Sequence, residues 1–276
     1  MSKHQLKRLK RFEEKMRKRP EMRAKERQKK KERIKAMREQ GIELGPSRKK
    51  LKKNCMVDSA CKTQVVIDCS FDHLMQDKQV MCLVQQLQFC YAANRRAANP
   101  LQFYVTSCDD KTLTRLDQAG NYRNWDIHYK TEPYHEVFPK ENIVYLSSES
   151  DNVLEAFEDD KAYIIGGLVD FNHHKGLCHK LAVERGLQHA RLPIDEYAFL
   201  KTRKVLTINH VFEILLHFSE TKSWKEAFLS VIPSRKGLRV LPESATSKNT
   251  NSSDTAQNHV TRETDLSEAK TNKSND

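Results

Sequence analysis

Apolar and polar residues follow two alternating patterns along the middle of this sequence. Short apolar runs rich in β-branched residues predict strands, and longer segments with apolar residues every three or four positions predict helices. The expected strands are residues 64–70, 101–107, 143–148, 162–169 and 190–194. The expected helices are residues 73–98, the acidic segment 151–157, 175–187 and 209–219. Strands that alternate with helices at this spacing predict an α/β domain with a mainly parallel sheet.

The two ends of the chain have a different composition. Residues 21–40 are rich in helix-forming Glu, Lys, Arg, Ala and Gln but have no continuous apolar stripe, which predicts a solvated basic helix. After Pro242 the residues are mostly Ser, Thr, Asn and acidic, which is typical of disorder. We therefore divide the chain into four parts. They are a basic, helical or partly disordered arm (1–53), a linker (54–63), the α/β domain (64–240) and a disordered polar tail (241–276).

Positive charge is concentrated in the arm. Residues 1–53 contain 23 Lys and Arg against 7 Glu, a net charge of +16, whereas the whole chain carries +12. A near-neutral domain with a concentrated basic arm indicates a polyanionic partner, most simply nucleic acid, bound with a strong dependence on salt. Lys29, Lys30 and Lys31 are candidates for contacts with RNA phosphates, and the same run also fits a nuclear localisation signal. The alternative is a charged tail without a specific role.

Several classes of protein and of site are disfavoured by what the sequence lacks. No run approaches the ~18 apolar residues of a membrane span, and the first residues lack the pattern of a secretory signal, so we expect an intracellular protein without membrane contact. Seven cysteines without a C-x-x-C pair indicate reduced thiols. The absence of a G-x-G-x-x-G or Walker sequence argues against dinucleotide or nucleoside triphosphate sites. No second group of ligands accompanies His173, His174, Cys178 and His179, so we expect no metal.

The segment 162–176 carries the strongest chemical signal. A buried apolar strand ends in Gly166 and Gly167, which permit a sharp turn or a close approach of the backbone to a ligand. Asp170 follows, so we expect its carboxylate near the carboxyl end of the sheet, where open α/β folds bind ligands. The alternative is an ordinary turn in which Asp170 caps the helix that begins near Lys175.

Other expected strands also end in turn residues, at 145–148 and 192–194, and residues 204–210 lead into the last expected helix. Loops that gather at one edge of a sheet, with backbone amides and aliphatic side chains, are able to hold an adenine ring and a ribose without a phosphate-binding loop. A ligand with no phosphate fits this pattern best.

These segments, taken in order, resemble a known family. The matching segments are 65–70, Tyr91 with 94–96, 145–148, 165–170 with Asn172 and Lys175, 192–194 and 203–212. In them the chain resembles the tRNA (guanine-9-N1)-methyltransferases of the SPOUT class, from the basic arm to about Gly237, and it is most similar to their eukaryotic nuclear and cytosolic branch.

The resemblance implies a SPOUT-type, mainly parallel α/β sheet with a C-terminal trefoil knot, preceded by the basic helical arm. It also implies S-adenosyl-L-methionine as the cofactor, tRNA as the partner, a monomer, no metal, and a location in nucleus and cytoplasm. Asp170 matches the proposed general base, and Arg95 and Arg96 are candidates for RNA contact, with a solvated helix end as the alternative. The implied cofactor-binding residues are Leu146, Gly167, Phe171, Asn172, His173, His174, Lys175, Cys178, Leu192, Lys204, Val205 and Leu206.

The chemistry sets a limit on the role of Asp170. Guanine N1 carries a proton at neutral pH, and this proton must leave as N1 attacks the methyl group. An aspartate carboxylate with an ordinary pKa of about 3.9 is a weak base for that proton, so orientation of N1–H and stabilisation of developing charge are alternatives to abstraction.

Two alternative functions stay open, which are N1-methylation of adenosine at the same position and RNA binding without catalysis. At two places, Phe171 and Asp195-Glu196, the sequence departs from the family pattern.

Overall fold

The structure is a computed structural model that describes residues 2–42, 45–108, 110–120, 122–158, 160–171, 173–199, 205–233 and 236–240. The chain divides into two units, residues 1–240 and 241–276. The expected tail (241–276), and with it the second unit, lies outside the described residues. In the described part, no helix combines the length and the apolar character that crossing a membrane requires.

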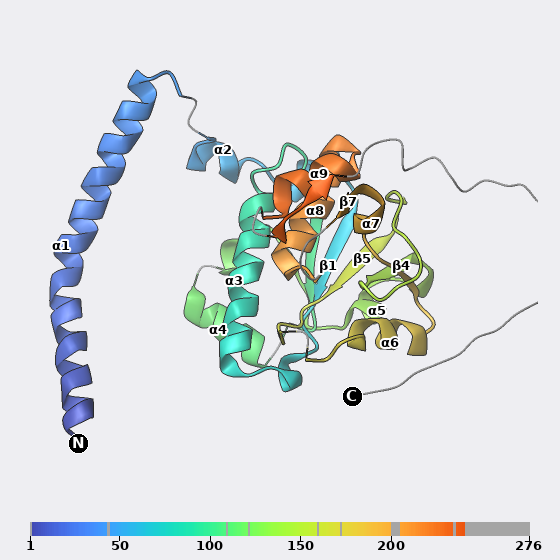
Figure 1. Ribbon diagram of the computed structural model, residues 1–276, viewed down its shortest axis with the longest axis horizontal. Coiled ribbons are helices and arrows are strands. Elements are labelled where there is room, and N and C mark those ends of the chain that lie inside the picture. Colours follow the sequence, from blue (N-terminus) through green and yellow to red (C-terminus); the bar gives the residue numbers. More distant parts are fainter. Residues whose placement is uncertain are drawn as a thin grey trace, which may run out of the picture. The chain divides into compact units, whose positions relative to one another are not determined.

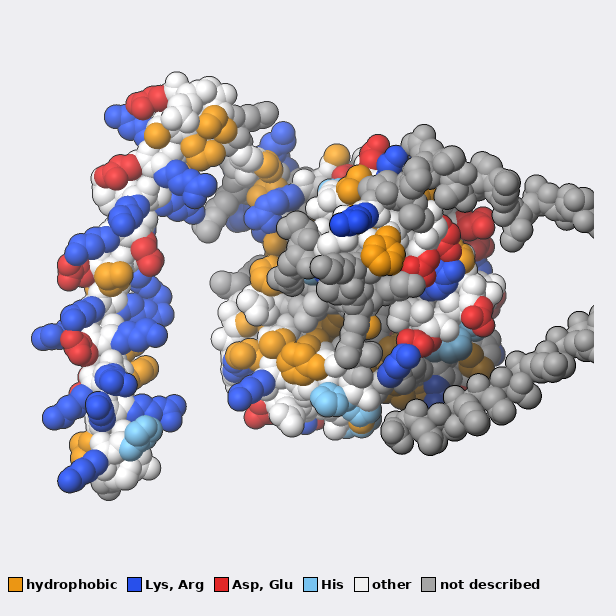
Figure 2. Space-filling model, in the orientation of Figure 1, with side chains coloured by type: hydrophobic (Ala, Val, Ile, Leu, Met, Phe, Trp, Pro, Cys, Tyr) orange, Lys and Arg blue, Asp and Glu red, His pale blue; other side chains and the backbone are white. Residues whose placement is uncertain are grey.

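The arm contains one long helix. Helix α1 (Lys3–Glu39) starts at Ser2, whose hydroxyl accepts a hydrogen bond from the Gln5 N–H, and it has no buried residue. It is longer than the expected helix 21–40 because it continues through Pro20, where the ring removes one backbone N–H donor. Strong helix formers on both sides and ion pairs one turn apart, such as Glu14–Lys18 at 2.7 Å, favour this continuation. Figure 2 shows Lys and Arg side chains along its whole length.

The residues after the arm pack against the α/β domain. A short helix α2 (Arg48–Lys52) is followed by segment 54–63, which we expected to be a linker. Asn54 Nδ2 donates to the backbone carbonyl oxygens of Arg95 and Ala97, at 3.1 and 2.8 Å. Met56 is buried, and its backbone N–H donates to Asp126 Oδ2 at 2.7 Å. The segment is therefore fixed to the domain from Asn54 onward.

Six parallel strands form the sheet (Figure 1), in the order β3-β2-β1-β5-β4-β6. They are β1 (Gln64–Asp68), β2 (Gln102–Thr106), β3 (His128–Tyr129), β4 (Ile143–Leu146), β5 (Ala162–Gly166) and β6 (Gln188–Ala190). All the pairings are parallel. The carboxyl ends of the strands therefore meet at one edge of the sheet, as the alternation of strands and helices predicted.

Helices cover both faces of this sheet (Figure 1). They are α3 (Asp77–Asn94), α4 (Asp110–Ala119), α5 (Tyr134–Val137), α6 (Leu177–Glu184), α7 (Ile194–Tyr197), α8 (Ile208–Thr221) and α9 (Trp224–Val231). Short 3-10 turns lie at Met56–Asp58, Asp72–Leu74, Tyr122–Asn124 and Lys140–Asn142. A separate antiparallel pair is formed by β7 (Ala198–Phe199) and β8 (Arg239–Val240).

The strands send alternate side chains to opposite faces, as the period of two requires. Val65 and Ile67 of β1 join a large apolar core with helices α3, α8 and α9. Val66, between them, joins a smaller core with α5 and α6 on the other face. Because both faces are covered, the central strands are almost continuously apolar, which is the pattern that identified them in the sequence.

Two expected elements differ from the structure. Residues 151–157 do not form the helix that we predicted. Leu154 is buried, its N–H donates to the Arg191 carbonyl oxygen at 2.9 Å, and Val153 forms a parallel bridge with Arg191, so contacts with a distant segment override local helix propensity. The expected strand 190–194 is also wrong in its limits, because β6 ends at Ala190 and α7 begins at Ile194.

Candidate donor-binding cavity

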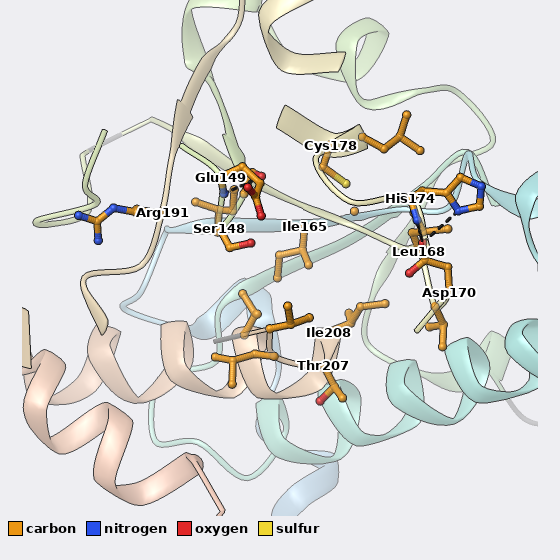
Figure 3. A pocket seen from close by; sticks show the side chains of 18 of the residues that line it. Ser148, Glu149, Ile165, Leu168, Asp170, His174, Cys178, Arg191, Thr207 and Ile208 are labelled. Carbon is orange, nitrogen blue, oxygen red and sulfur yellow. Dashed lines mark hydrogen bonds and ion pairs between the residues drawn. The ribbon is translucent and has the colours of Figure 1, made fainter. Parts of the chain in front are cut away.

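A cavity of about 620 Å³ opens at the carboxyl ends of β4 and β5. Its walls come from the loops after β4, β5 and β6, from the middle of α3, and from residues 205–211 at the start of α8. Apolar side chains line much of it, including Leu146, Ile165, Leu192, Leu206 and Ile208. Figure 3 shows Asp170 and His174 at one end of the cavity, with Glu149 and Arg191 toward the other. A cavity of this size and character suits a nucleoside-sized ligand, for which ~300–1,000 Å³ is typical.

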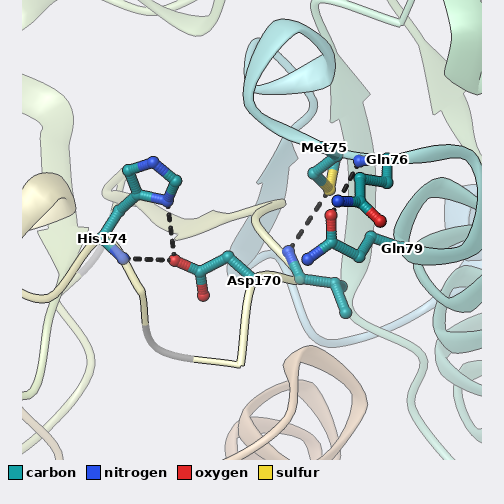
Figure 4. Close-up of polar contacts among 6 residues, drawn as sticks. Met75, Gln76, Gln79, Asp170 and His174 are labelled. Atoms are coloured by element: carbon teal, nitrogen blue, oxygen red, sulfur yellow. Dashed lines mark hydrogen bonds and ion pairs between the residues drawn. The ribbon is translucent and has the colours of Figure 1, made fainter.

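Asp170 is held in a fixed position at this cavity. Asp170 lies four residues after β5, and its side chain is only 10% exposed. Asp170 Oδ2 accepts a hydrogen bond from the His174 backbone N–H at 2.6 Å and lies 3.0 Å from His174 Nδ1 (Figure 4). The preceding residue is fixed as well, since the Val169 N–H points at Met75 Sδ at 3.4 Å. The arrangement presents a largely buried, oriented carboxylate to the cavity.

Asp170 is not the N-cap residue of helix α6, which was the alternative interpretation of its position. Helix α6 begins at Leu177, and its N-cap position is Gly176, which has no side chain to cap it. Asp170 instead closes the turn that precedes the helix, where its carbonyl oxygen also accepts from the His173 N–H at 3.3 Å. The carboxylate therefore has a local structural role in the turn and lines the cavity at the same time.

The two glycines permit close contacts within the protein. A Cβ at Gly167 would lie 2.5 Å from the Asp68 carbonyl oxygen, and a Cβ at Gly166 would lie 2.5 Å from Cys178 Sγ. The Gly167 N–H donates to the same Asp68 oxygen at 2.7 Å. We had expected either a turn or an approach to a ligand, and the structure places backbone against backbone at Gly167 and backbone against a side chain at Gly166.

These contacts predict different costs for the two alanine substitutions. Gly167→Ala should lower the free energy of unfolding by about 3 kcal/mol, because the clash is with main chain that cannot move aside. Gly166→Ala should cost about 1 kcal/mol, because only a side-chain sulfur is in the way. Urea denaturation checks both values. Adding Cys178→Ala should reduce the cost of Gly166→Ala but not that of Gly167→Ala, and equal behaviour of the two double variants would contradict this interpretation.

Two buried polar groups, of Asp68 and Tyr145, lie close to Cys178 of the cavity wall. Tyr145 OH, from β4, donates to Asp68 Oδ2, at the end of β1, at 3.2 Å. Burial is the main cause that raises the pKa of Asp68, and burial also raises the pKa of Tyr145. Burial raises the pKa of the Cys178 thiol to about 11, and the hydrogen bond with Tyr145 acts against this shift. Cys178 therefore lines the cavity as a neutral thiol at physiological pH.

The raised pKa predicts slow alkylation of Cys178. The thiolate is the reactive form, so the rate with iodoacetamide, followed peptide by peptide by mass spectrometry, should rise about tenfold per pH unit between pH 7 and 9 without reaching a plateau. If the cavity holds the cofactor that the resemblance implies, its demethylated form S-adenosylhomocysteine should protect Cys178, while the alkylation of Cys55, outside the cavity lining, should continue. A plateau for Cys178 below pH 9 would contradict a neutral thiol with a raised pKa.

Most of the predicted cofactor residues meet at this cavity. Those in its walls are Leu146, Phe171, His174, Cys178, Leu192, Val205 and Leu206, together with Asp170. Gly167, His173 and Lys175 lie nearby but outside the lining, and Lys175 pairs with Glu149 at 3.8 Å. Asn172 and Lys204 lie outside the described residues, as does Arg203. The described residues contain no group of three side chains suited to a metal ion.

Several lining residues were missed in the sequence. Cys82 and Gln86 come from one face of α3, and Gln86 Oε1 accepts from the Ile208 N–H at 2.9 Å, which satisfies the first turn of α8. Arg191 lies in the wall and makes a two-point ion pair with Glu196, at 2.7 and 3.2 Å. In the sequence, the one hint of a role for Gln86 was its polar side chain between Leu83 and Leu87, which are both buried. This pattern does not reveal that Gln86 contacts Ile208.

The residues predicted to contact RNA differ in how accessible their side chains are to a phosphate. Arg95 Nη1 donates to Tyr91 OH at 3.2 Å, and its guanidinium lies over the Tyr91 ring, which itself stacks on Trp125. Arg96 is exposed and donates to the Ala92 carbonyl oxygen one turn back. Lys29, Lys30 and Lys31 are exposed on α1. Arg96 and the three lysines are accessible to a polyanion, whereas Arg95 is partly committed to the end of α3.

Comparison with solved structures identifies the class. The chain is similar to full-length spTrm10 crystallised as a complex with SAH, at 41% identity and a TM-score of 0.59, covering 64% of this chain and 99% of that one. It is also similar to spTrm10(74), at 38% identity and a TM-score of 0.59, covering 69% and 100%. The fold is that of the SPOUT methyltransferases. The expected fold class, a mainly parallel α/β sheet preceded in the sequence by a basic helix, is confirmed. The trefoil knot stays a prediction.

The chain belongs to the tRNA (guanine(9)-N(1))-methyltransferase TRM10/TRM10A family, whose model matches residues 1–237. It is 42% identical over 246 residues to the tRNA (guanine(9)-N1)-methyltransferase of Schizosaccharomyces pombe, covering 86% of this chain and 80% of that protein. It is 47% identical over 195 residues to human tRNA methyltransferase 10 homolog A, covering 70% of this chain. The match spans 57% of the length of the human protein.

Proposed function

We propose that the protein transfers a methyl group from S-adenosyl-L-methionine to N1 of guanosine at position 9 of tRNA. The observation that carries this proposal is the position of Asp170, a fixed and largely buried carboxylate in the wall of a cavity of nucleoside size. Membership of the family supports the substrate, and the SAH complex of spTrm10 supports the class of cofactor.

The cavity residues fit this cofactor in size and chemistry. Apolar side chains such as Leu146, Leu192 and Leu206 would hold the adenine ring, and Ser147 and Ser148 offer hydroxyl groups to the ribose. Three carboxylates, of Glu149, Asp170 and Asp195, line the cavity and favour a cationic ligand. When bound, S-adenosylmethionine supplies an electrophilic methyl group on a positively charged sulfur.

We propose that Asp170 acts on the proton of guanine N1. In the transfer, the bond from N1 to the methyl carbon forms, the bond from sulfur to that carbon breaks, and the N1 proton leaves. Both His174 contacts hold Asp170 Oδ2, so the carboxylate is oriented before the base arrives. It orients N1–H and accepts the proton, or stabilises the charge that develops as the proton departs to water.

The basic arm supplies the attraction for tRNA in this proposal. Exposed cations along α1, with Arg96 on the domain, would contact phosphates and position the RNA without reading its sequence. A base that is embedded in the folded tRNA must be extruded to reach the cavity, at a cost of a few kcal/mol that these contacts offset. We further propose that the protein acts as a monomer in nucleus and cytoplasm and that its C-terminal part forms the trefoil knot.

The test is methyl transfer to unmodified tRNA transcripts with guanosine, adenosine or cytidine at position 9, in the presence of S-adenosylmethionine labelled in its methyl group. We expect N1-methylguanosine at position 9 of the first transcript and no label in the third. Label in the adenosine transcript alone would replace the proposal with adenosine methylation. Tight tRNA binding with no label in any transcript would indicate a noncatalytic RNA-binding protein.

A further inference from the structure

The residue after Asp170 is unusual both in its backbone and in its exposure. Phe171 is 80% exposed, the highest value among the exposed large apolar side chains of the described residues. Its φ of 55° lies in the left-handed region, which is unfavourable for a residue with a bulky side chain. A residue that would ordinarily be buried is therefore held in solvent by a strained turn.

The turn itself explains how the ring is held there. Phe171 is the second residue of a tight turn in which the His173 N–H donates to the Asp170 carbonyl oxygen at 3.3 Å, and a positive φ at that position is a feature of the mirror-image turn types. The bonds from His174 to Asp170 Oδ2 close the same turn from the other side. The backbone conformation of Phe171 is therefore fixed by the contacts that orient the carboxylate.

Phe171 also belongs to the border of the cavity. Phe171 belongs to its lining, next to Asp170 in the chain, although most of the side chain faces solvent. Other exposed phenylalanines of the described residues, Phe12, Phe89 and Phe199, do not line the cavity. Phe171 is thus an accessible aromatic side chain at the border of the cavity, next in the chain to the carboxylate that we propose acts on the base.

We propose that Phe171 is the stacking platform for the extruded purine, so that the face of the base lies on the phenyl ring while its N1 edge meets Asp170. This inference rests on the proposed function and adds a substrate-positioning residue to it. Aromatic side chains stack on unpaired bases, and strain at a ligand-binding turn is a recognised form of preorganisation. Because both purines present a similar π-face, the ring should hold the base without distinguishing guanine from adenine.

The test compares three substitutions in the full chain. Phe171→Leu keeps an apolar side chain without a ring, Phe171→Gly relieves the left-handed strain and removes the ring, and Phe171→Tyr keeps the ring. Phe89→Leu, on the exposed surface of α3, is the matched control. The measurements are the single-turnover rate of methylation of saturating tRNA with guanosine at position 9, the Kd for tRNA, and the Kd for S-adenosylhomocysteine.

We expect Phe171→Leu and Phe171→Gly each to lose about tenfold in the single-turnover rate, and Phe171→Tyr and Phe89→Leu to stay within about twofold of the wild type. Both Kd values should change by less than about twofold, because phosphates dominate tRNA affinity and most of the Phe171 side chain faces solvent, away from the cavity interior. Three results would overturn the stacking role and leave the proposed function in place. They are a wild-type rate in Phe171→Leu, a rate in Phe171→Gly that is clearly faster than that in Phe171→Leu, and a loss of S-adenosylhomocysteine affinity that parallels the loss of rate. A wild type without methyl transfer would remove the proposed function as well.

Discussion

Asp170→Asn is expected to lower the rate of methyl transfer at least about 100-fold, within the range of ~100- to 10,000-fold that a general acid or base contributes. Asparagine keeps a side-chain oxygen that can accept from the His174 N–H, so the turn should survive. It cannot carry the negative charge or accept the N1 proton. Single-turnover kinetics with saturating S-adenosylmethionine and tRNA measure the effect on the chemical step.

The controls separate chemistry from folding and binding. The affinities of Asp170→Asn for S-adenosylhomocysteine and for tRNA should stay within about threefold of the wild type, because asparagine has nearly the same size as aspartate, S-adenosylhomocysteine lacks the sulfonium charge, and the arm is unaltered. Asp117→Asn removes an exposed carboxylate that pairs with Arg123 at 3.1 Å and should leave the rate unchanged, because exposed ion pairs contribute little. An Asp170→Asn rate close to that of the wild type would exclude Asp170 from the chemistry.

Removal of residues 1–53 is expected to weaken tRNA binding at least about 100-fold at low salt, because a net charge of +16 is lost with them. The truncation should end at Lys53, since Asn54 and Met56 are already fixed to the domain. A plot of the logarithm of the binding constant against that of the salt concentration should become several units less steep. Affinity for S-adenosylhomocysteine should not change.

A smaller change tests the same interpretation without shortening the chain. Replacing Lys29, Lys30 and Lys31 by glutamine should reduce the steepness of that plot by about two to three units if all three lysines contact phosphates. Glutamine is a good helix former, so α1 should persist, which circular dichroism can check. An unaltered salt dependence in both the truncated and the triply substituted protein would mean that the arm does not bind the RNA.

The central strands could be predicted because burial on both faces makes them almost continuously apolar, as in β1 and β5. The helix expected at 151–157 was wrong because its local pattern does not reveal that Val153 and Leu154 pair with Arg191, far along the chain. The start of α1 was missed because Pro20 is read as a helix boundary, although the flanking residues favour helix on both sides.

The site was predictable to a similar extent. Asp170 was found because a strand, two glycines and an acid occur together within one short segment, and the resemblance to the family supplied Leu146, Leu192 and Leu206. The contributions of Cys82 and Gln86 could not be predicted, because they depend on how α3 packs against the start of α8. The exposure and the left-handed backbone of Phe171 are also tertiary properties, which one sequence does not reveal.

We propose that the cavity at the ends of β4 and β5 holds the methyl donor beside Asp170. A crystal structure of the protein soaked or grown with saturating S-adenosylhomocysteine tests it most directly. We predict the ligand inside the cavity, in contact with Leu146, Leu192 and Leu206 and adjacent to the loop that carries Asp170. A cavity that stays empty at saturation, or a ligand bound elsewhere on the protein, would show that this cavity is not the site of the methyl donor.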